Sequence, residues 1–424
     1  MMAPQRFQVK DVAHSVLWYH RDHYAGHPNR GGIWNLGNGE IAVAHVNAHR
    51  PYRGREDTFH DYMHTARILL QRSFDSGETW PQDQETVIWN RGAGIEEHRE
   101  WLFGDPSDRQ ELDMTQPGAI FHFGQVAAGY DLEQEEQSTG KTAKAPSLVH
   151  FGLRSVDGGR TWENRPTVIA PPSHRDGNIV ANFPMVQFEN GVFAKAATVG
   201  GGQLPDGEVC MHVTDNHGLT WDYMQTIAAD PLGISGYTYP SLLRLPNGRL
   251  LAIMHRLNIG SNGNIGNWPC LCASDDGGMS WSQPRAMIRP DQSPWPAHRK
   301  PLQFDRPRTI TSNAVPVPAF MPQAPGAPMY RAPYPVLLRD GRILVILGRR
   351  KAPPGISCIL SEDGGQTWLP EVVLRADGAE GDGGYPVATE LDDGRIFTAY
   401  YFCTEPELPF GGPRYVAGTH FRID

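Results

Sequence analysis

An eight-residue motif recurs five times in this 424-residue chain, and it constrains the fold more than any other feature. The template is S-x-D-x-G-x-T-W, and the copies begin at Ser73, Ser155, Thr214, Ser274 and Ser361. The Asp and the first hydroxyl can hydrogen-bond nearby backbone N–H groups and close a turn. The Gly permits a left-handed backbone, and the Trp offers a large apolar surface to a neighbouring sheet. A motif repeated in this way predicts an architecture built from repeated hairpins.

The motif is known as the Asp box, and the chain resembles the sialidase (neuraminidase) superfamily of β-propellers. The resemblance implies that the boxes lie on the outer rim, away from the active face, and that their residues serve the turns. The third copy has Asn216 at the Asp position. Because the Asn side chain keeps an accepting oxygen, we expect this turn to form as well.

A second signature accompanies most boxes: an apolar run, a tight turn with Gly, and another apolar run. Asn-Gly or Asp-Gly pairs, the strongest short hairpin signal, stand at 38–39, 190–191, 247–248, 340–341 and 393–394. The last of these units, which starts near Tyr385, has no box. We expect residues 14–20 to supply its outermost strand and so to close the ring. The sequence therefore predicts an all-β fold, a six-bladed β-propeller with five Asp-box repeats that forms a single domain over residues 1–424.

Three long insertions interrupt the repeat, at residues 95–115, 127–144 and 291–328. Insertions of this length in a compact domain often carry binding or lid functions. The five cysteines favour buried free thiols over disulfides or a zinc site. We predict no metal and no cofactor.

Charge and hydropathy bear on the partners and on the compartment. The net charge of −9 argues against nucleic acid as a partner. No apolar run is long enough to cross a bilayer, so we expect no membrane partner. Residues 1–10 lack the apolar core of a signal peptide. We expect a soluble protein that is either cytoplasmic or secreted with its leader already removed.

The resemblance also implies a set of catalytic roles. Sialidases grip the carboxylate of the sugar with three arginines, and they use a Tyr nucleophile, a Glu that activates it and an Asp acid/base. A phenol suits this reaction because the reacting carbon already bears a carboxylate, which would repel an anionic nucleophile.

Four arginines match the family positions. Arg30 precedes the first strand of blade one, where His27 is a second candidate for contact with substrate. Arg256 ends the second predicted strand of blade four, and Arg349 and Arg350 occupy the equivalent place in blade five. A guanidinium fork can donate two parallel hydrogen bonds to one carboxylate.

The other roles fall on three further residues. Tyr385, at the start of blade six, resembles the nucleophile. Asp61 resembles the acid/base, and His60 beside it is a candidate for contact with substrate. His60 and His64 with Asp61 also form a possible metal cluster, which we do not favour because this loop leads into a strand and not along a helix.

The chain departs from the family pattern in blade four. Tyr239 stands where the activating Glu is expected, with Tyr237 close by as a candidate for contact with substrate. Two phenols both titrate near pH 10, so one cannot act as a general base for the other at neutral pH. Either another carboxylate, Asp382, Glu96 or Glu97, takes over the role of the Glu, or the chemistry differs from that of the sialidases.

We therefore predict an exo-acting glycoside hydrolase of the sialidase-like type. Its partner would be a glycan with a terminal carboxylated sugar, such as a sialic acid. Two alternatives remain open. One is a uronate-directed polysaccharide lyase in which Tyr239 or Tyr385 acts with His255 or His60. The other is a propeller that binds carbohydrate without catalysis.

Overall fold

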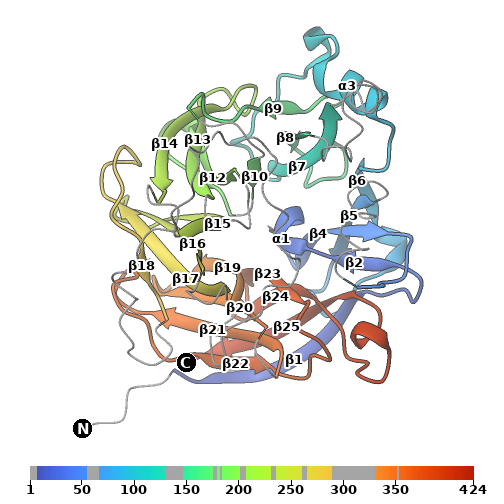
Figure 1. Cartoon of the computed structure of the whole chain (residues 1–424), viewed down its shortest axis with the longest axis vertical. Helices are drawn as coiled ribbons and strands as arrows, with labels where there is room; N and C mark the ends of the chain where they lie inside the picture. Colours follow the sequence, from blue (N-terminus) through green and yellow to red (C-terminus); the bar gives the residue numbers. More distant parts are fainter. Residues whose placement is uncertain are drawn as a thin grey trace, which may run out of the picture.

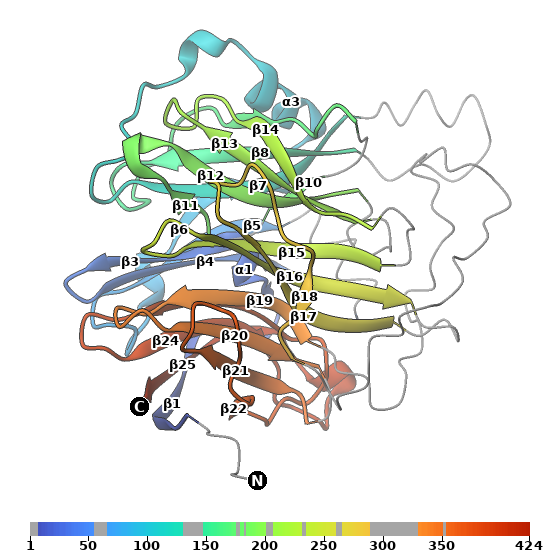
Figure 2. The ribbon, with the colours of Figure 1, turned by 90° about the vertical axis from the view of Figure 1, so that its left-hand side faces the viewer.

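The computed structural model describes residues 7–54, 66–129, 147–174, 179–181, 184–200, 207–230, 235–259, 265–288, 330–350 and 353–424. Six antiparallel sheets stand around a central axis as the blades of a propeller (Figure 1). Seen from the side, the blades lie one above another, and each sheet runs across the thickness of the ring (Figure 2). The predicted six-bladed all-β fold is confirmed.

The first three blades differ in how complete they are. Blade one contains β2 (Tyr24–Gly26), β3 (Gly32–Gly37), β4 (Glu40–Ala48), β5 (Arg67–Ser73) and β6 (Thr86–Asn90). Blade two contains β7 (Ile120–Gly129), β8 (Ser147–Ser155) and β9 (Thr167–Ile169). Blade three contains β10 (Ile179–Ala181), β11 (Val186–Gln187), β12 (Phe193–Val199), β13 (Glu208–Thr214) and β14 (Asp222–Ala228).

The last three blades are regular four-stranded sheets. Blade four contains β15 (Ser235–Arg244), β16 (Leu250–Ile259), β17 (Ile265–Ser274) and β18 (Arg285–Ala286). Blade five contains β19 (Tyr330–Leu337), β20 (Ile343–Arg349), β21 (Gly355–Ser361) and β22 (Val372–Arg375). Blade six contains β23 (Gly384–Glu390), β24 (Ile396–Phe402), β25 (Tyr415–Ile423) and the N-terminal strand β1 (Val9–Trp18).

The N-terminal strand closes the ring as the sequence predicts. β1 pairs antiparallel with β25, from Val9 opposite Ile423 to Trp18 opposite Val416. This pairing covers the backbone groups that β25 would otherwise expose at its edge. The two ends of the chain are thus joined within one blade.

Each Asp box closes the turn between the two outer strands of its blade. In the first copy the Asp75 carboxylate accepts hydrogen bonds from the Thr79 backbone N–H (2.9 Å) and hydroxyl (2.6 Å), and Ser73 Oγ accepts one from the Gly77 N–H (2.8 Å). In the Asn216 copy, Oδ1 accepts from the Thr220 N–H at 3.0 Å, so the turn survives the loss of charge as predicted.

The tryptophans of the boxes pack between blades. Trp80 of blade one stacks on Phe397 of blade six, with ring centroids 5.5 Å apart. Trp221 of blade three meets Phe121 and Phe123 of blade two edge-on, at 5.8 and 5.5 Å. The box thus links a local turn to the apolar contact that holds neighbouring blades together.

Two helices were not predicted. α1 (Pro28–Gly31) interrupts the inner edge of blade one and lies at the centre of the ring (Figure 1). α3 (Ile95–Phe103) falls within the first predicted insertion. Most of the second insertion and all of the third lie outside the described residues. All five cysteines are buried and free, as expected. Within the described residues, no helix is long and apolar enough to cross a membrane.

Candidate active site at the hub

Three inner strands, and the residue that precedes helix α1, bring one residue each to the hub by the same local device. His27, Tyr239, Ala332 and Tyr385 have positive φ angles of 53°, 54°, 45° and 52°, and each directly precedes a proline. This conformation is disfavoured for a residue with a side chain, and especially before proline. In β15, β19 and β23 the strand register also shifts at this dipeptide, which marks a β-bulge. Bulges re-aim side chains, and here they aim them at the hub.

Three of these residues, Tyr239, Ala332 and Tyr385, form a buried cluster together with Tyr401 of β24. The hydroxyl oxygens of Tyr239 and Tyr385 lie 3.2 Å apart and share a hydrogen bond. The His27 ring lies against the rings of Tyr385 and Tyr401, with centroid separations of 4.7 and 4.9 Å. The two tyrosines predicted from the sequence are therefore direct neighbours, although they are 146 positions apart in the chain.

A buried ion pair borders this cluster. Arg350 donates from Nη2 to Asp382 Oδ1 (2.9 Å) and to the Tyr401 hydroxyl (3.2 Å). Asp382 also accepts hydrogen bonds from the hydroxyls of Tyr401 (2.8 Å) and Tyr52 (2.6 Å). The Arg350 guanidinium carbon lies 5.3 Å from the centre of the Tyr385 ring. Asp382 thus holds Arg350 in place beside Tyr385.

Burial and charge determine the protonation states of the hub. Burial, and after it the neighbouring Tyr385, raises the pKa of Tyr239 to about 12 against the opposing charges of Arg30 and Arg331. Burial, reinforced by the Asp382 carboxylate, raises the pKa of Tyr401 well above its usual value. These two phenols stay protonated at neutral pH, so they act as hydrogen-bond donors and acceptors and not as bases.

His255 is a further titratable group that faces the phenols. Its ring meets the Tyr239 ring edge-on at 5.5 Å, and its side chain is fully buried. Burial lowers its pKa well below 6.5, and the charges of Arg331 and Arg350 lower it further. Within the described part of the chain, neither ring nitrogen has a hydrogen-bond partner. The imidazole is therefore neutral.

The remaining predicted residues fall into three groups. Arg30 belongs to α1, the helix at the centre of the ring (Figure 1), and is near enough for its charge to act on Tyr239. The structure does not bring Arg349 to the cluster: its guanidinium pairs with Glu371 at 3.2 Å and donates to the Pro353 carbonyl. Asp61 and His60 lie outside the described residues.

The end of β16 differs from the prediction. The strand continues to Ile259, so Arg256 lies inside it and does not end it. Successive residues of a strand point to opposite faces, which separates Arg256 from His255. Arg256 lies opposite Tyr237 on the neighbouring strand β15. Burial raises the pKa of Tyr237 to about 12, and the charge of Arg256 acts against this rise.

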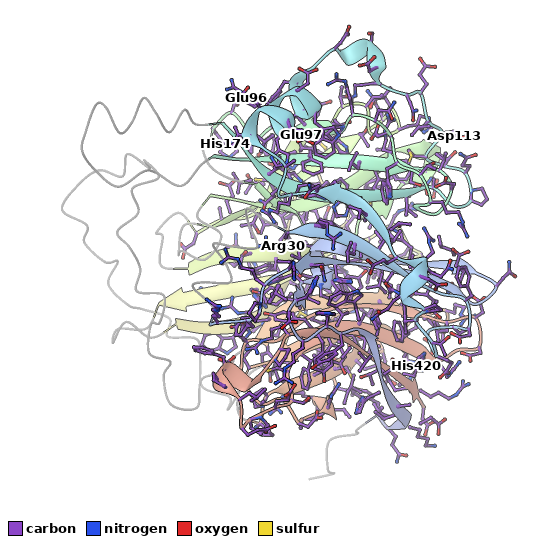
Figure 3. All side chains as sticks on the ribbon, turned by 90° about the vertical axis from the view of Figure 1, so that its right-hand side faces the viewer. Arg30, Glu96, Glu97, Asp113, His174 and His420 are labelled. Carbon is purple, nitrogen blue, oxygen red and sulfur yellow. The ribbon has the colours of Figure 1, made fainter. Side chains whose placement is uncertain are left out.

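Of the three proposed substitutes for the missing Glu, only Asp382 reaches the cluster. Glu96 and Glu97 are exposed and lie in the first turn of α3 near the edge of the ring, away from Arg30 (Figure 3). The sequence analysis missed Arg331, which lies next to the aimed Ala332, and also Tyr401 and Tyr52. It named His255 only for the lyase alternative. No group of three or more potential metal ligands occurs among the residues that the structure covers.

Known proteins with related sequences or folds include several glycoside hydrolases. The sialidase of Micromonospora viridifaciens is 26% identical over 341 residues, which cover 78% of this chain and 44% of that protein. The chain thus spans less than half the length of this curated relative. A crystal structure of a protein of unknown function from Dyadobacter fermentans shares 21% identity with a TM-score of 0.69, and the match covers 98% of this chain and 99% of the other. An α-L-arabinanase from Penicillium chrysogenum shares 14% identity with a TM-score of 0.55, over 94% of this chain and 93% of the other.

The family comparison agrees with the repeats and with the six blades. The family described as BNR repeat-like domain matches residues 133–398, which is more than half of the chain. Five Asp boxes, the closed ring and the matched region all point to the same relationship. The chain therefore belongs to the family of BNR repeat-like domains, within the sialidase-like superfamily of β-propellers.

Proposed function

We propose that the hub binds the terminal carboxylated sugar of a glycan and hydrolyses its glycosidic bond, with Tyr385 as the nucleophile. The observation that carries the proposal is the hydrogen-bonded pair of Tyr239 and Tyr385, buried among guanidinium groups. Arg350 lies beside the Tyr385 ring, and the charges of Arg30 and Arg331 act on Tyr239. Paired phenols in a cationic surrounding suit a substrate that carries its own negative charge.

The arginines would hold the carboxylate of the sugar. A guanidinium keeps its charge at all physiological pH values and offers a planar set of donors. Arg350 is fixed by Asp382, so little side-chain entropy remains to be lost when substrate binds. Arg331, and not Arg256, would hold the carboxylate beside Tyr239, since the charge of Arg331 acts on both Tyr239 and His255.

The chemistry would proceed in two displacements. The Tyr385 oxygen attacks the anomeric carbon, the glycosidic bond breaks, and the leaving oxygen takes a proton from an acid, for which Asp61 stays the candidate from the sequence. The phenolic proton of Tyr385 passes to Tyr239, which gives its own proton to a base. Water then attacks the anomeric carbon of the glycosyl–tyrosine and gives a proton to the carboxylate of the acid, the bond between this carbon and the Tyr385 oxygen breaks, and the proton on the base returns through Tyr239 to Tyr385.

His255 is our candidate for the base. Burial and the charges of Arg331 and Arg350 keep its pKa low in the free enzyme. A bound carboxylate would offset these two charges and so raise the affinity of the imidazole for a proton. The substrate itself would thereby prepare the base, in place of the Glu that the family pattern expects.

Fluorogenic α-sialosides and uronosides test the proposal, with neutral glycosides that carry the same leaving group as controls. We expect turnover only of the carboxylated substrates. Tyr385→Phe should lower kcat on the order of a thousandfold or more. Tyr19→Phe, which changes a half-exposed tyrosine on the rim, should leave kcat unchanged. Lack of turnover on every carboxylated glycoside, or full activity of Tyr385→Phe, would rule the proposal out.

The neutral, buried His255 beside Tyr239 favours a second candidate, the elimination reaction of a uronate lyase. The base would take the proton from the carbon next to the carboxylate, the electron pair would form a double bond, and the glycosidic oxygen would leave. The two reactions are distinguished by their products. Hydrolysis in H₂¹⁸O places the label on the sugar, whereas elimination places none and yields an unsaturated product that absorbs in the ultraviolet.

A further inference from the structure

A half-exposed phenylalanine lies in the loop between β24 and β25, in a backbone conformation that residues with a side chain rarely adopt. Phe410 has φ and ψ angles of 59° and 21°, and it is 51% exposed. The next two residues, Gly411 and Gly412, also have positive φ angles, but glycine tolerates them without strain. Strain of this kind persists only where the surrounding structure fixes it, and it is concentrated at sites that bind ligands.

Buried contacts hold this loop in its strained conformation. The carbonyls of Phe410 and Gly412 accept hydrogen bonds from Arg414 Nη1 at 2.8 and 2.9 Å. The Arg414 side chain is fully buried and pairs with Glu380. Its guanidinium carbon lies 3.8 Å from the centre of the Tyr52 ring. The backbone that presents the Phe410 ring is therefore fixed in advance, so little conformational entropy remains to be lost when a ligand binds.

Strand pairing places the loop at the hub end of blade six. The loop joins the end of β24 to the start of β25. Tyr401, near the end of β24, lies opposite Gly384, the residue before Tyr385. The loop that contains Phe410 thus leaves the sheet at the same end as the proposed nucleophile.

A row of aromatic rings connects the hub with Phe410. Tyr401 meets Tyr24 edge-on with ring centroids 6.2 Å apart, and Tyr24 stacks with Tyr52 at 6.0 Å. Tyr52 meets Phe410 edge-on at 6.1 Å, and its hydroxyl donates to Asp382 at 2.6 Å. Phe410 is the most exposed member of the row. It therefore offers an aromatic surface to solvent at the edge of the hub.

We propose that Phe410 binds a sugar of the leaving part of the glycan, beyond the terminal carboxylated sugar in the hub, by stacking on the apolar face of that sugar. The C–H groups on one face of a pyranose carry partial positive charge, which the negative face of an aromatic ring attracts. The proposal rests on the proposed function, because that function assigns the hub to the terminal sugar. Phe410 is then a specificity residue, and the substrate class is an oligosaccharide in preference to a small glycoside.

The test compares a methyl glycoside with an oligosaccharide that has the same terminal sugar. One pair is methyl α-sialoside and 3′-sialyllactose, and the other is methyl glucuronide and glucuronyl-glucose. For the pair that is turned over, Phe410→Ala should lower kcat/KM of the oligosaccharide about tenfold and leave that of the methyl glycoside within about twofold. An equal loss for both members of the pair, or no loss for either, would overturn the proposal.

Matched variants separate the ring from the fold. Phe410→Trp keeps an aromatic face and should retain most of the kcat/KM for the oligosaccharide. Phe410→Gly removes both the ring and the strain, so it should lose as much kcat/KM as Phe410→Ala but have the higher melting temperature of the two. A loss of kcat/KM that follows the melting temperature, and is thus smaller in Phe410→Gly, would reveal a structural effect and overturn the proposal.

A second phenylalanine provides the control for exposure. Phe74 is 50% exposed and lies in the first Asp box, at the end of β5 that faces away from the hub. Phe74→Ala should change kcat/KM for none of the four substrates. The same selective loss in Phe74→Ala as in Phe410→Ala would contradict a role specific to Phe410.

Binding measurements keep this proposal distinct from catalysis. If none of the four substrates is turned over, the proposed function fails, but calorimetry with the same compounds still tests Phe410. The wild type should bind the oligosaccharide of at least one pair about tenfold more tightly than the methyl glycoside, and Phe410→Ala should abolish the difference. Equal affinities within both pairs, or no binding of any of the four compounds, would overturn the assignment of Phe410.

Discussion

Replacement of Asp382 tests whether the ion pair with Arg350 holds the hub together. The carboxylate accepts hydrogen bonds from Arg350, Tyr401 and Tyr52 at 2.9, 2.8 and 2.6 Å. The side chains of Arg350 and Asp382 are only 6% and 13% exposed. Asp382→Ala would leave a buried guanidinium without its counter-ion, which costs about 3–5 kcal/mol of unfolding free energy.

The chain provides a matched control. Asp377 pairs with Arg375 at 2.6 Å, and its own side chain is 59% exposed, so removal of the carboxylate opens this site to water. Arg375 is only 9% exposed but keeps its hydrogen bonds to the hydroxyls of Tyr400 and Tyr415. We expect Asp377→Ala to cost about 1 kcal/mol or less. Asp382→Asn keeps an accepting oxygen and removes only the charge, so its cost should lie between the two, at about 1–3 kcal/mol.

Urea unfolding followed by tryptophan fluorescence measures these differences, provided that the m-value is unchanged among the variants. Kinetics give a second measurement, since a displaced Arg350 should raise the KM for carboxylated substrates more than it lowers kcat. Equal destabilisation by Asp382→Ala and Asp377→Ala would refute the reasoning, because burial would then make no difference to the ion pair.

Three further predictions concern the hub, the boxes and the buried histidines. Tyr239→Phe removes the 3.2 Å hydrogen bond to Tyr385 and with it the proposed path of the proton to the base, so it should lower kcat by roughly a hundredfold or more, whereas unchanged steady-state kinetics would exclude Tyr239 from the reaction. Asp363→Ala removes three hydrogen bonds of its box and should cost about 1–2 kcal/mol in urea unfolding, but Asp363→Asn less than about 1 kcal/mol, as the intact Asn216 turn indicates. The pKa values of buried His45 and His122 are lowered to about 4, so they stay neutral when folded, and stability present above pH 6.5 should be lost as the pH falls toward 4. The slope should approach about 1.4 kcal/mol per pH unit for each histidine, and equal stability at pH 7 and pH 5 would contradict this account.

The architecture could be predicted because its signals are local. A box folds through hydrogen bonds between residues four positions apart, so its sequence alone specifies the turn. The closing strand could also be inferred, because the last unit of the sequence has only three strands of its own. In the structure β1 supplies the fourth. The helix α1 could not be predicted, because its contacts with β7, β23 and β24 join it to segments far away in the sequence.

The site could be predicted only in part, because the side chains that reach the hub depend on where each strand ends and on which face of the sheet each residue lies. Tyr385 was identified from its place at the start of an inner strand and Tyr239 from its place where the family pattern expects a Glu, and the structure brings them together. Arg256 was expected at the end of β16, but the strand runs three residues further. Because successive side chains of a strand point to opposite faces, His255 faces the hub and Arg256, the next residue, does not.

The strained residues show how the same repeat provides both the fold and the site. His27, Tyr239, Ala332 and Tyr385 adopt left-handed φ angles before proline, in four different blades. Each such residue costs about 1–3 kcal/mol, which surrounding structure has to offset. Three of these four residues meet in one buried cluster, so the strain falls where side chains converge. A non-glycine residue before proline at the start of an inner strand is therefore a sequence signal for the hub. This signal finds Ala332 and with it the neighbouring Arg331, which the search for family arginines passed over.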